Sequence, residues 1–225
     1  MKKYALWKFL LCFVIFFMFQ AAITAMADDR KVITDFSTGV NADGVPDGWQ
    51  LKEKSGHADL SVVADNALHV LRLRSMDTSF SIQKEVNVDV HQYPIFTWKW
   101  KATKLPEGGD FRKSGNDDQA AQLFLAFSRT KAIVYVWDTT APEGMVGDAD
   151  APFFMKIKVV VVRSGPEGLG KWITETRNVY RDYQKFFGSA EKSPKVGGIR
   201  IQINSQHTKT SAESYFADVV FQKQR

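Results

Sequence analysis

Ile95-Phe96-Thr97-Trp98-Lys99-Trp100-Lys101 decides the fold class, because its large aromatic residues occupy every second position. Side chains alternate between the two faces of a β-strand, so Phe96, Trp98 and Trp100 share one face while mostly polar residues share the other. Tryptophans arranged in this way usually belong to a core. The stretch therefore predicts a half-buried β-strand in a sheet with one covered face.

The same alternation recurs along most of the chain. Apolar faces of this kind are formed by Leu123, Leu125 and Phe127, by Ile133, Tyr135 and Trp137, and by Ile199, Ile201 and Ile203. Further β-rich runs cover residues 60–64, 68–74, 80–86, 155–163, 172–179 and 215–221, with Asp-Gly, Gly-Gly and Gly-Pro turns between several of them. About ten or more strands predict an all-β fold, a jelly-roll-like sandwich of two packed antiparallel sheets. One short helix is predicted near residues 180–187, where Gly188 would end it.

The N-terminal stretch has the pattern of a bacterial secretory signal. Lys2 and Lys3 precede an apolar run from Phe9 to Phe19, and Ala25-Met26-Ala27 supplies the small residues of a cleavage site. The apolar run is too short to cross a bilayer comfortably. We therefore expect a signal peptide over residues 1–27, cleavage near Ala27, a single β-sandwich domain over residues 28–225, and a periplasmic or secreted location.

Composition narrows the classes of partner. The chain has 30 basic and 25 acidic residues, and removal of Lys2, Lys3 and Lys8 leaves 27 against 25. This near balance gives no support for nucleic-acid binding, which usually requires a strongly basic face. The single cysteine, Cys12, lies in the signal sequence, so the remaining chain has no disulfide and no thiolate chemistry. We expect a monomer with no transmembrane segment after cleavage, and a glycan or an envelope protein as its partner.

Asp110, Asp117 and Asp118 form the densest group of carboxylates. Hard cations prefer several oxygen ligands, so one interpretation is a Ca²⁺ site, the only cofactor that the sequence suggests. The other interpretation is a solvated loop in which aspartates cap turns through local backbone hydrogen bonds. The spacing does not match an EF-hand loop, and both interpretations stay open at this point.

Glu175 and Arg177 share one face of a predicted strand with apolar neighbours. Charges rarely face a core unless they are paired, so these two would pair with each other or with Arg163 or Asp182. They form either the polar floor of a ligand groove or a structural ion pair that fixes strand register. Trp172 follows a glycine-rich loop and is the best candidate for an aromatic contact with a ligand.

Several stretches occur in an order that resembles a known family. They are Trp98-Lys99-Trp100, Leu105-Pro106, Asn116-Asp117-Asp118, Tyr135-Val136-Trp137, residues 172–179, Asp182-Tyr183 and Phe187-Gly188. Their order and spacing are similar to those of DUF3047, a bacterial exported family named as a domain of unknown function. The resemblance covers nearly all of the chain after the signal sequence. It implies a β-sandwich shaped like carbohydrate-binding modules, and it implies no established activity.

The chain departs from the pattern of that family at two places. Asn204-Ser205-Gln206-His207-Thr208 stands where the family pattern is acidic, and Gln122 stands where the pattern has arginine. If those family residues bind a cation or act chemically, this chain lacks them.

The leading functional hypothesis is a non-catalytic β-sandwich that binds a glycan or another envelope ligand. Its groove would lie on one sheet and use, as contacts, Trp172, Glu175, Arg177, Arg200, Gln202 and Asn204. One alternative is a glycan hydrolase or lyase that pairs Glu175 with Asp118 or Tyr135. Another is a protein–protein interaction module of the cell envelope. Fold analogy alone cannot separate these classes.

Overall fold

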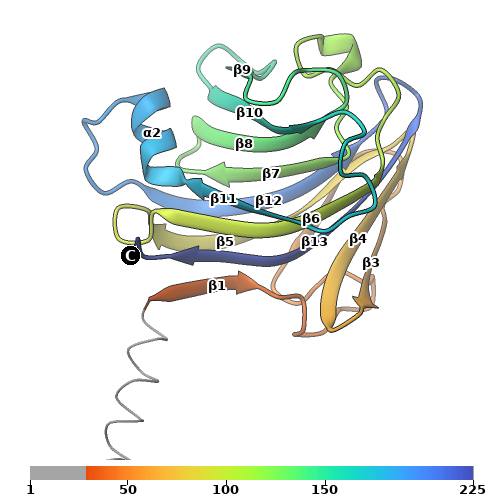
Figure 1. The fold of residues 1–225 in the computed structure, drawn as a ribbon, viewed down its shortest axis with the longest axis horizontal. Helices are drawn as coiled ribbons and strands as arrows, with labels where there is room; N and C mark the ends of the chain where they lie inside the picture. The colour runs from red at the N-terminus through yellow and green to blue at the C-terminus, as the bar shows by residue number, and fades with distance from the viewer. Residues whose placement is uncertain (1–28, 225) are drawn as a thin grey trace, which may run out of the picture.

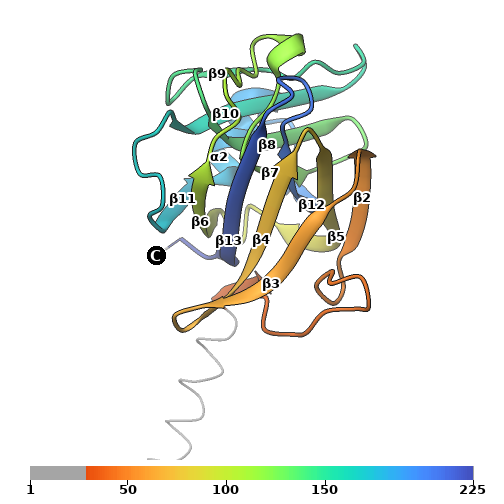
Figure 2. The ribbon, with the colours of Figure 1, turned by 90° about the vertical axis from the view of Figure 1, so that its right-hand side faces the viewer.

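β-Strands dominate residues 29–224, the part of the chain that this computed structural model describes. The predicted signal sequence, residues 1–27, lies outside the described residues. Among residues 29–224, no helix is both long and apolar enough to cross a membrane. The strands form two sheets that face each other across an aromatic core (Figures 1 and 2). The predicted all-β, jelly-roll-like sandwich is confirmed.

One sheet has six strands. Figure 2 shows five of them side by side, in the order β11-β6-β13-β4-β3, and β1 pairs with β13 beside them. Their bounds are β1 Arg30–Thr34, β3 Asp59–Asp65, β4 Leu68–Met76, β6 Ile95–Lys104, β11 Ile173–Asn178 and β13 Ser211–Gln222. β13 is the longest strand, and it pairs with β6 along one side and with β4 and then β1 along the other.

The other sheet has seven strands in the order β2-β5-β12-β7-β8-β10-β9. Figure 1 shows the strands from β12 to β10 one above the other, and Figure 2 shows β2 beside β5. Their bounds are β2 Gln50–Ser55, β5 Ser79–Asp89, β7 Ala121–Ala126, β8 Lys131–Asp138, β9 Val146–Asp148, β10 Lys156–Ser164 and β12 Lys195–Asn204. A short 3-10 helix, η1 (Ser114–Asn116), lies in the connection that leads from the six-stranded sheet to β7.

One strand pair differs from the antiparallel prediction. β10 pairs with β8 in parallel, and β9 then pairs antiparallel with the far side of β10. A parallel neighbour requires a connection that returns to the start of the first strand. Residues 139–155 make this connection and include β9. Alternation along β8 and β10 is the same for either direction, so the sequence pattern could not reveal the difference.

Three strands of the structure were not predicted from the sequence. β1 and β9 have only five and three residues, and β2 reads QLKEKS with exposed positions on both faces. β2 and β9 are the two outer strands of their sheet. Edge strands bury little and carry charge, so they lack the alternation by which a half-buried strand is recognised.

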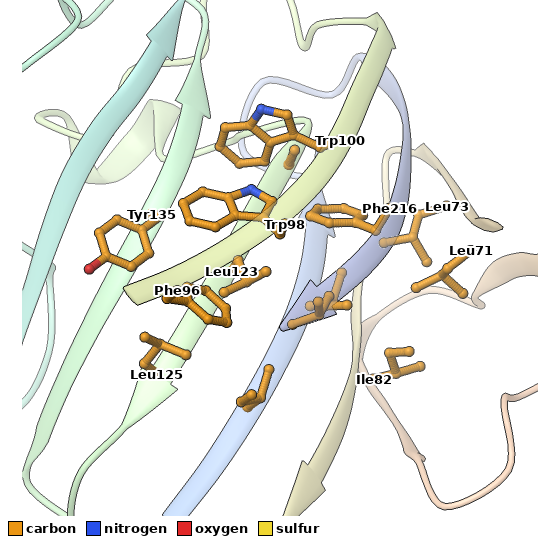
Figure 3. Packing of buried hydrophobic residues seen from close by; sticks show 14 of the residues in the cluster. Leu71, Leu73, Ile82, Phe96, Trp98, Trp100, Leu123, Leu125, Tyr135 and Phe216 are labelled. Carbon is orange, nitrogen blue, oxygen red and sulfur yellow. The ribbon is translucent and has the colours of Figure 1, made fainter. Parts of the chain in front are cut away.

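The core is an aromatic layer between the sheets. Phe96, Trp98 and Trp100 project from β6 and are fully buried, as their alternation predicted. Figure 3 shows them facing the seven-stranded sheet, whose contribution includes Leu123, Leu125 and Tyr135. The ring of Trp98 stacks on Tyr135 with centroids 5.3 Å apart, and it meets Trp100 edge-on at 5.4 Å. Offset and edge-on ring contacts of this kind add to the free energy gained from burial.

The single predicted helix is present as α2, Val179–Phe187. Asn178 caps its first turn, because the side-chain oxygen of Asn178 accepts a hydrogen bond from the backbone N–H of Arg181 at 3.0 Å. Gly188 ends it with φ of 84°, a left-handed conformation that glycine adopts without strain. The helix packs Tyr183 and Phe187 against Phe127 of the seven-stranded sheet.

Replacing Trp98 with alanine tests the importance of the aromatic layer. We expect Trp98→Ala to lower the free energy of unfolding by about 3–5 kcal/mol, because it leaves a large cavity between the sheets. The matched control is Phe153→Ala, since Phe153 is 98% exposed and its loss should change stability by less than about 0.5 kcal/mol. Urea denaturation measures both variants. Equal effects of the two changes would contradict the role assigned to the layer.

Candidate functional site

A groove crosses the outer face of the seven-stranded sheet, the face turned away from the aromatic core. It consists of two adjoining cavities of about 450 and about 340 Å³. Phe124 of β7, Arg200 of β12 and Ile157 of β10 line both cavities, so they lie where the two meet. A groove of this total size can hold a small molecule or a short segment of a polymer.

Alternation explains why these side chains face outward. Leu123 and Leu125 lie in the core, so Phe124 between them points to the opposite face. Ile199 and Ile201 likewise direct Arg200 into the groove. Arg200 and Phe124 are direct partners across the β12–β7 pair. The Arg200 guanidinium lies over the Phe124 ring, 5.3 Å from its centroid, in a cation–π contact.

One row of directly opposed residues crosses six strands of the groove floor. From β2 to β10 the row is Gln50, Gln83, Arg200, Phe124, Val134 and Val159. The row is polar on the β2–β5–β12 side and apolar on the β8–β10 side. The groove can therefore accept a ligand that has both hydrogen-bonding groups and apolar faces.

Loops close the apolar side of the outer face. Val134, Val136, Val159 and Val161 pack with Phe111 and Ala141 in a second, smaller hydrophobic cluster. Phe111 precedes η1, and Ala141 lies in the connection from β8 to β9. The backbone of the same region is held by Asp138, whose carboxylate accepts hydrogen bonds from Phe111, Thr140 and Ala141. These contacts give the groove a wall as well as a floor.

A hydrogen-bond network fixes the polar end of the smaller cavity. The buried side-chain oxygen of Asn204 accepts from the backbone N–H of Gln119 at 3.0 Å and from the side-chain amide of Gln122. The Asn204 amide donates to the Asp117 carbonyl oxygen at 2.6 Å. Gln202 donates to Gln122 over a longer 3.4 Å. The two departures from the family pattern, Gln122 and residues 204–208, are thus adjacent at this end of the groove.

The three aspartates predicted as Ca²⁺ ligands have separate protein partners. Asp110 accepts two hydrogen bonds from the Arg112 guanidinium, at 2.7 and 2.8 Å, and these hold its carboxyl pKa far below the usual value. Oδ2 of Asp118 accepts from the backbone and hydroxyl of Thr208. Asp117 lines the smaller cavity and accepts from Gln119. Within residues 29–224, no three acidic, histidine or cysteine side chains are arranged to hold a metal ion.

Glu175 lies inside the sandwich rather than in the groove. It is on β11, at the edge of the six-stranded sheet, and is 6% exposed. Its carboxylate accepts from Arg163 at 2.7 Å and from the indole N–H of Trp100 at 3.1 Å. The hydrogen bond that Arg163 donates to Glu175 raises the pKa of Arg163. The geometry therefore supports the structural ion pair among the two interpretations of Glu175, with Arg163 as its partner.

Arg177 also pairs inward, with Asp182 of α2. Its guanidinium donates two hydrogen bonds to the Asp182 carboxylate, at 2.9 and 3.1 Å, and the Tyr135 hydroxyl donates to the same carboxylate at 2.7 Å. Burial by itself would lower the pKa of Arg177, but the contacts with Asp182 outweigh burial and raise it. Burial, followed by the charge of Asp182, raises the pKa of Tyr135 well above its usual value. This network ties the helix to both sheets.

The six predicted ligand contacts do not share one groove, which corrects the grouping made from the sequence. Arg200, Gln202 and Asn204 line the groove on the seven-stranded sheet. Glu175 and Arg177 belong to β11 of the other sheet, and Trp172, just before β11, donates from its indole N–H to Asp65 at 2.9 Å. Alternation assigns a residue to one face of its own strand but does not tell which strands share a sheet.

Three residues that line the groove were not predicted from the sequence: Phe124, Gln83 and Gln50. One signal for Phe124 was available. The alternation that places Leu123 and Leu125 in the core leaves a large aromatic residue on the solvent face of the same strand. Gln83 and Gln50 carried no comparable signal, because a glutamine on the outer face of a strand is ordinary.

Removing the Glu175 carboxylate should destabilise the fold. We expect Glu175→Ala to lower the free energy of unfolding by about 2–3 kcal/mol, because Trp100 and Arg163 lose a charged acceptor. Glu107→Ala, which removes an exposed carboxylate, is the control and should cost less than about 0.5 kcal/mol. Urea denaturation at pH 7 measures both. A loss for Glu175→Ala as small as that of the control would argue against a structural pair.

Asp117 should weaken the fold at neutral pH. Burial raises the pKa of the Asp117 carboxyl in the folded protein above the unfolded value of about 3.9. At any pH at which this carboxyl is ionised, its burial therefore lowers the free energy of unfolding. This loss of stability disappears as the pH falls through the pKa of the folded state and then below that of the unfolded state. Asp117→Asn should therefore raise the melting temperature at pH 7, and its advantage should shrink toward pH 4. An advantage independent of pH would contradict this assignment.

Comparisons with solved structures find matches at low sequence identity. The xyloglucanase domain of NopAA, a type three effector from Sinorhizobium fredii, matches with a TM-score of 0.50 and 10% identity, covering 79% of this chain and 95% of that chain. A family 11 carbohydrate-binding module from a Clostridium thermocellum cellulase matches with a TM-score of 0.47 and 10% identity, covering 87% and 95%. At such identity, the NopAA match shows the fold alone.

No curated protein sequence matches the chain. The model of one family, "Protein of unknown function (DUF3047)", matches residues 47–220, which include the strands of the groove. The match spans most of the chain and confirms the resemblance seen in the sequence motifs. This protein belongs to the DUF3047 family.

Proposed function

We propose that the protein binds a glycan chain, without catalysis, in the groove over the seven-stranded sheet. The observation that carries this proposal is the row of side chains from Gln50 to Val159, in which amides, a guanidinium and an aromatic ring follow one another across the strands. Sugars present hydroxyl groups around the ring edge and C–H groups on the ring faces. A floor that combines polar side chains with an aromatic ring matches both.

The amide side chains in the groove keep hydrogen-bonding capacity for a ligand. Gln83 accepts from Arg200 over 3.5 Å and Gln202 donates to Gln122 over 3.4 Å, both of which are long for hydrogen bonds. Each amide offers two donors and one acceptor oxygen. Short hydrogen bonds to sugar hydroxyls would replace these long contacts at little cost. Phe124, half-buried beside them, offers an aromatic surface to the apolar side of a sugar.

The comparisons support this proposal only through the fold. The NopAA xyloglucanase domain was solved with cellobiose, which shows that a related sandwich can hold a β-linked sugar. A fold hosts many functions, so the groove residues, and not the likeness, carry the proposal. We also propose an exported location, in the periplasm or outside the cell, from the N-terminal signal pattern.

Glycan hydrolysis is the second candidate, and Asp117 is the observation that favours it. Burial raises the pKa of this carboxyl in the smaller cavity, which is the property that a general acid needs. Asp150 lines the same cavity and is exposed. Glu175 and Tyr135, suggested by the sequence for acid and base roles, engage other partners inside the sandwich.

A glycan-array screen of the full chain tests the binding function, with and without Ca²⁺. We expect selective binding to one class of glycan, and a loss of affinity of about tenfold in Phe124→Ala, because stacking on an aromatic ring contributes on the order of 1 kcal/mol or more. Trp172→Ala is the matched control, since Trp172 belongs to the other sheet. Equal losses in both variants would argue against the groove.

The other outcomes of the screen separate the remaining hypotheses. A blank array would overturn glycan binding and favour an envelope protein as partner. Dependence on Ca²⁺ would restore the calcium interpretation of the Asp117-Asp118 loop. Release of new reducing ends from a bound glycan by the wild type, but not by Asp117→Asn, would establish hydrolysis in place of simple binding.

A further inference from the structure

We propose that the ligand is an acidic glycan, and that a carboxylate of the sugar chain binds the guanidinium of Arg200. This inference rests on the proposed function and adds the chemical class of the ligand. It assigns Arg200 as the residue that selects charged sugars over neutral ones.

Within residues 29–224, Arg200 has no carboxylate within salt-bridge distance, in contrast to four other arginines. Four arginines form salt bridges at 2.7–3.2 Å: Arg72, Arg112, Arg163 and Arg177. For Arg200, the contacts found among the described residues are the face of Phe124 and the long hydrogen bond to Gln83. Both partners are neutral, so the positive charge at the centre of the groove is not compensated.

The surroundings supply no acidic group to this charge in the free protein. Arg200 is exposed to solvent, but the groove removes part of the water from its guanidinium, and this desolvation lowers the pKa of Arg200. The four paired arginines show the opposite direction, because an acidic partner raises the pKa of each. The guanidinium is therefore accessible to an external anion and has no internal anion to compete with it. A ligand carboxylate would be such an anion.

The larger cavity adds further positive charge around Arg200. Lys84, Arg129 and Lys131 line it, and Glu85 is the one carboxylate among its lining residues in the described part of the chain. In contrast, charges on the six-stranded sheet compensate each other, as in the Lys99–Asp218 pair. The larger cavity is therefore the place in the groove where electrostatic complementarity favours an anion.

The geometry of Arg200 fits a sugar carboxylate. A guanidinium presents parallel N–H donors that match the two oxygens of a carboxylate. The neighbouring Gln83 and Gln202 amides can bind ring hydroxyls of the same sugar residue, and Phe124 borders its apolar side. A sulfate or phosphate group on a glycan shares the negative charge, so the experiment separates these groups.

The test compares each acidic chain with its own neutralised form. Isothermal titration of the full chain uses oligogalacturonate, alginate and glucuronate-containing oligosaccharides, each beside its methyl-esterified form, with a sulfated galactan oligomer as a further ligand. We expect at least one carboxylated chain to bind about tenfold or more tighter than its ester, with affinity that falls as salt rises. Equal affinity for a chain and its ester, or preference for sulfate alone, would overturn the inference.

Variants at Arg200 connect this preference to one side chain. Arg200→Gln should remove the difference in affinity between acid and ester, because only the acid loses a charged partner, and Arg200→Lys should keep part of the difference. Since Arg200 has no acidic partner, its replacement by glutamine should leave the melting temperature unchanged or raise it. Arg181→Gln, an exposed arginine of α2, is the matched control and should change nothing.

These readouts separate the inference from the proposed function. Binding of neutral and esterified glycans with no effect of Arg200→Gln would leave glycan binding intact and overturn the acidic class. No binding of any glycan would overturn both. A fall in melting temperature for Arg200→Gln, but not for Arg181→Gln, would show that Arg200 has a structural role instead.

Discussion

The contact between the β6 aromatics and the seven-stranded sheet is the interaction on which the other features depend. Trp98 stacks on Tyr135, and Trp100 packs against Trp137 at 5.9 Å, so the two sheets are joined by large rings from both sides. Each ring buries more apolar surface than an aliphatic side chain of the core. These rings fill the interior of the sandwich, and the groove lies on an outer face.

Polar groups of the core are arranged around that aromatic layer. The indole of Trp100 donates to Glu175, and the hydroxyl of Tyr135 donates to Asp182. Two partly exposed arginines complete these networks: Arg163 pairs with Glu175, and Arg177 pairs with Asp182. The buried carboxylates therefore link β11 and α2 to the facing sheet, and removing one partner would leave the other charge uncompensated. These ion pairs fix the position of β11 relative to β10 and α2.

The two sheets use charge in different ways. On the six-stranded sheet, Lys99 and Arg72 have carboxylates within salt-bridge distance. In the groove of the other sheet, Arg200 is held over an aromatic ring beside an amide. Natural proteins often give up stability where a site must stay ready for a ligand. The role proposed for Arg200 as a ligand contact has this character, whereas Glu175 is paired with Arg163 inside the sandwich.

Local patterns predicted most of the elements but not their assembly. Alternation identified ten of the strands in the described chain and the buried face of β6, because side-chain direction along a strand has a fixed period of two. Apolar residues at helical spacing, followed by Gly188, predicted α2 and its end. The short or charged edge strands β1, β2 and β9 were missed, since they bury too little to show a pattern. The parallel pairing of β8 with β10 was not predicted, because side-chain alternation is the same in parallel and antiparallel strands.

For the candidate site as well, the sequence predicted local features but not how the strands assemble. The sequence by itself determined which face of its strand each residue occupies, so Arg200, Gln202 and Asn204 were recognised together, and Glu175 was expected to be paired. Only the tertiary structure decided that β11 and β12 belong to opposite sheets, and that β5, β12 and β7 bring Gln83, Arg200 and Phe124 into one row. The physical reason is that side-chain alternation follows from the local backbone. Strand pairing, in contrast, follows from contacts between segments far apart in the chain.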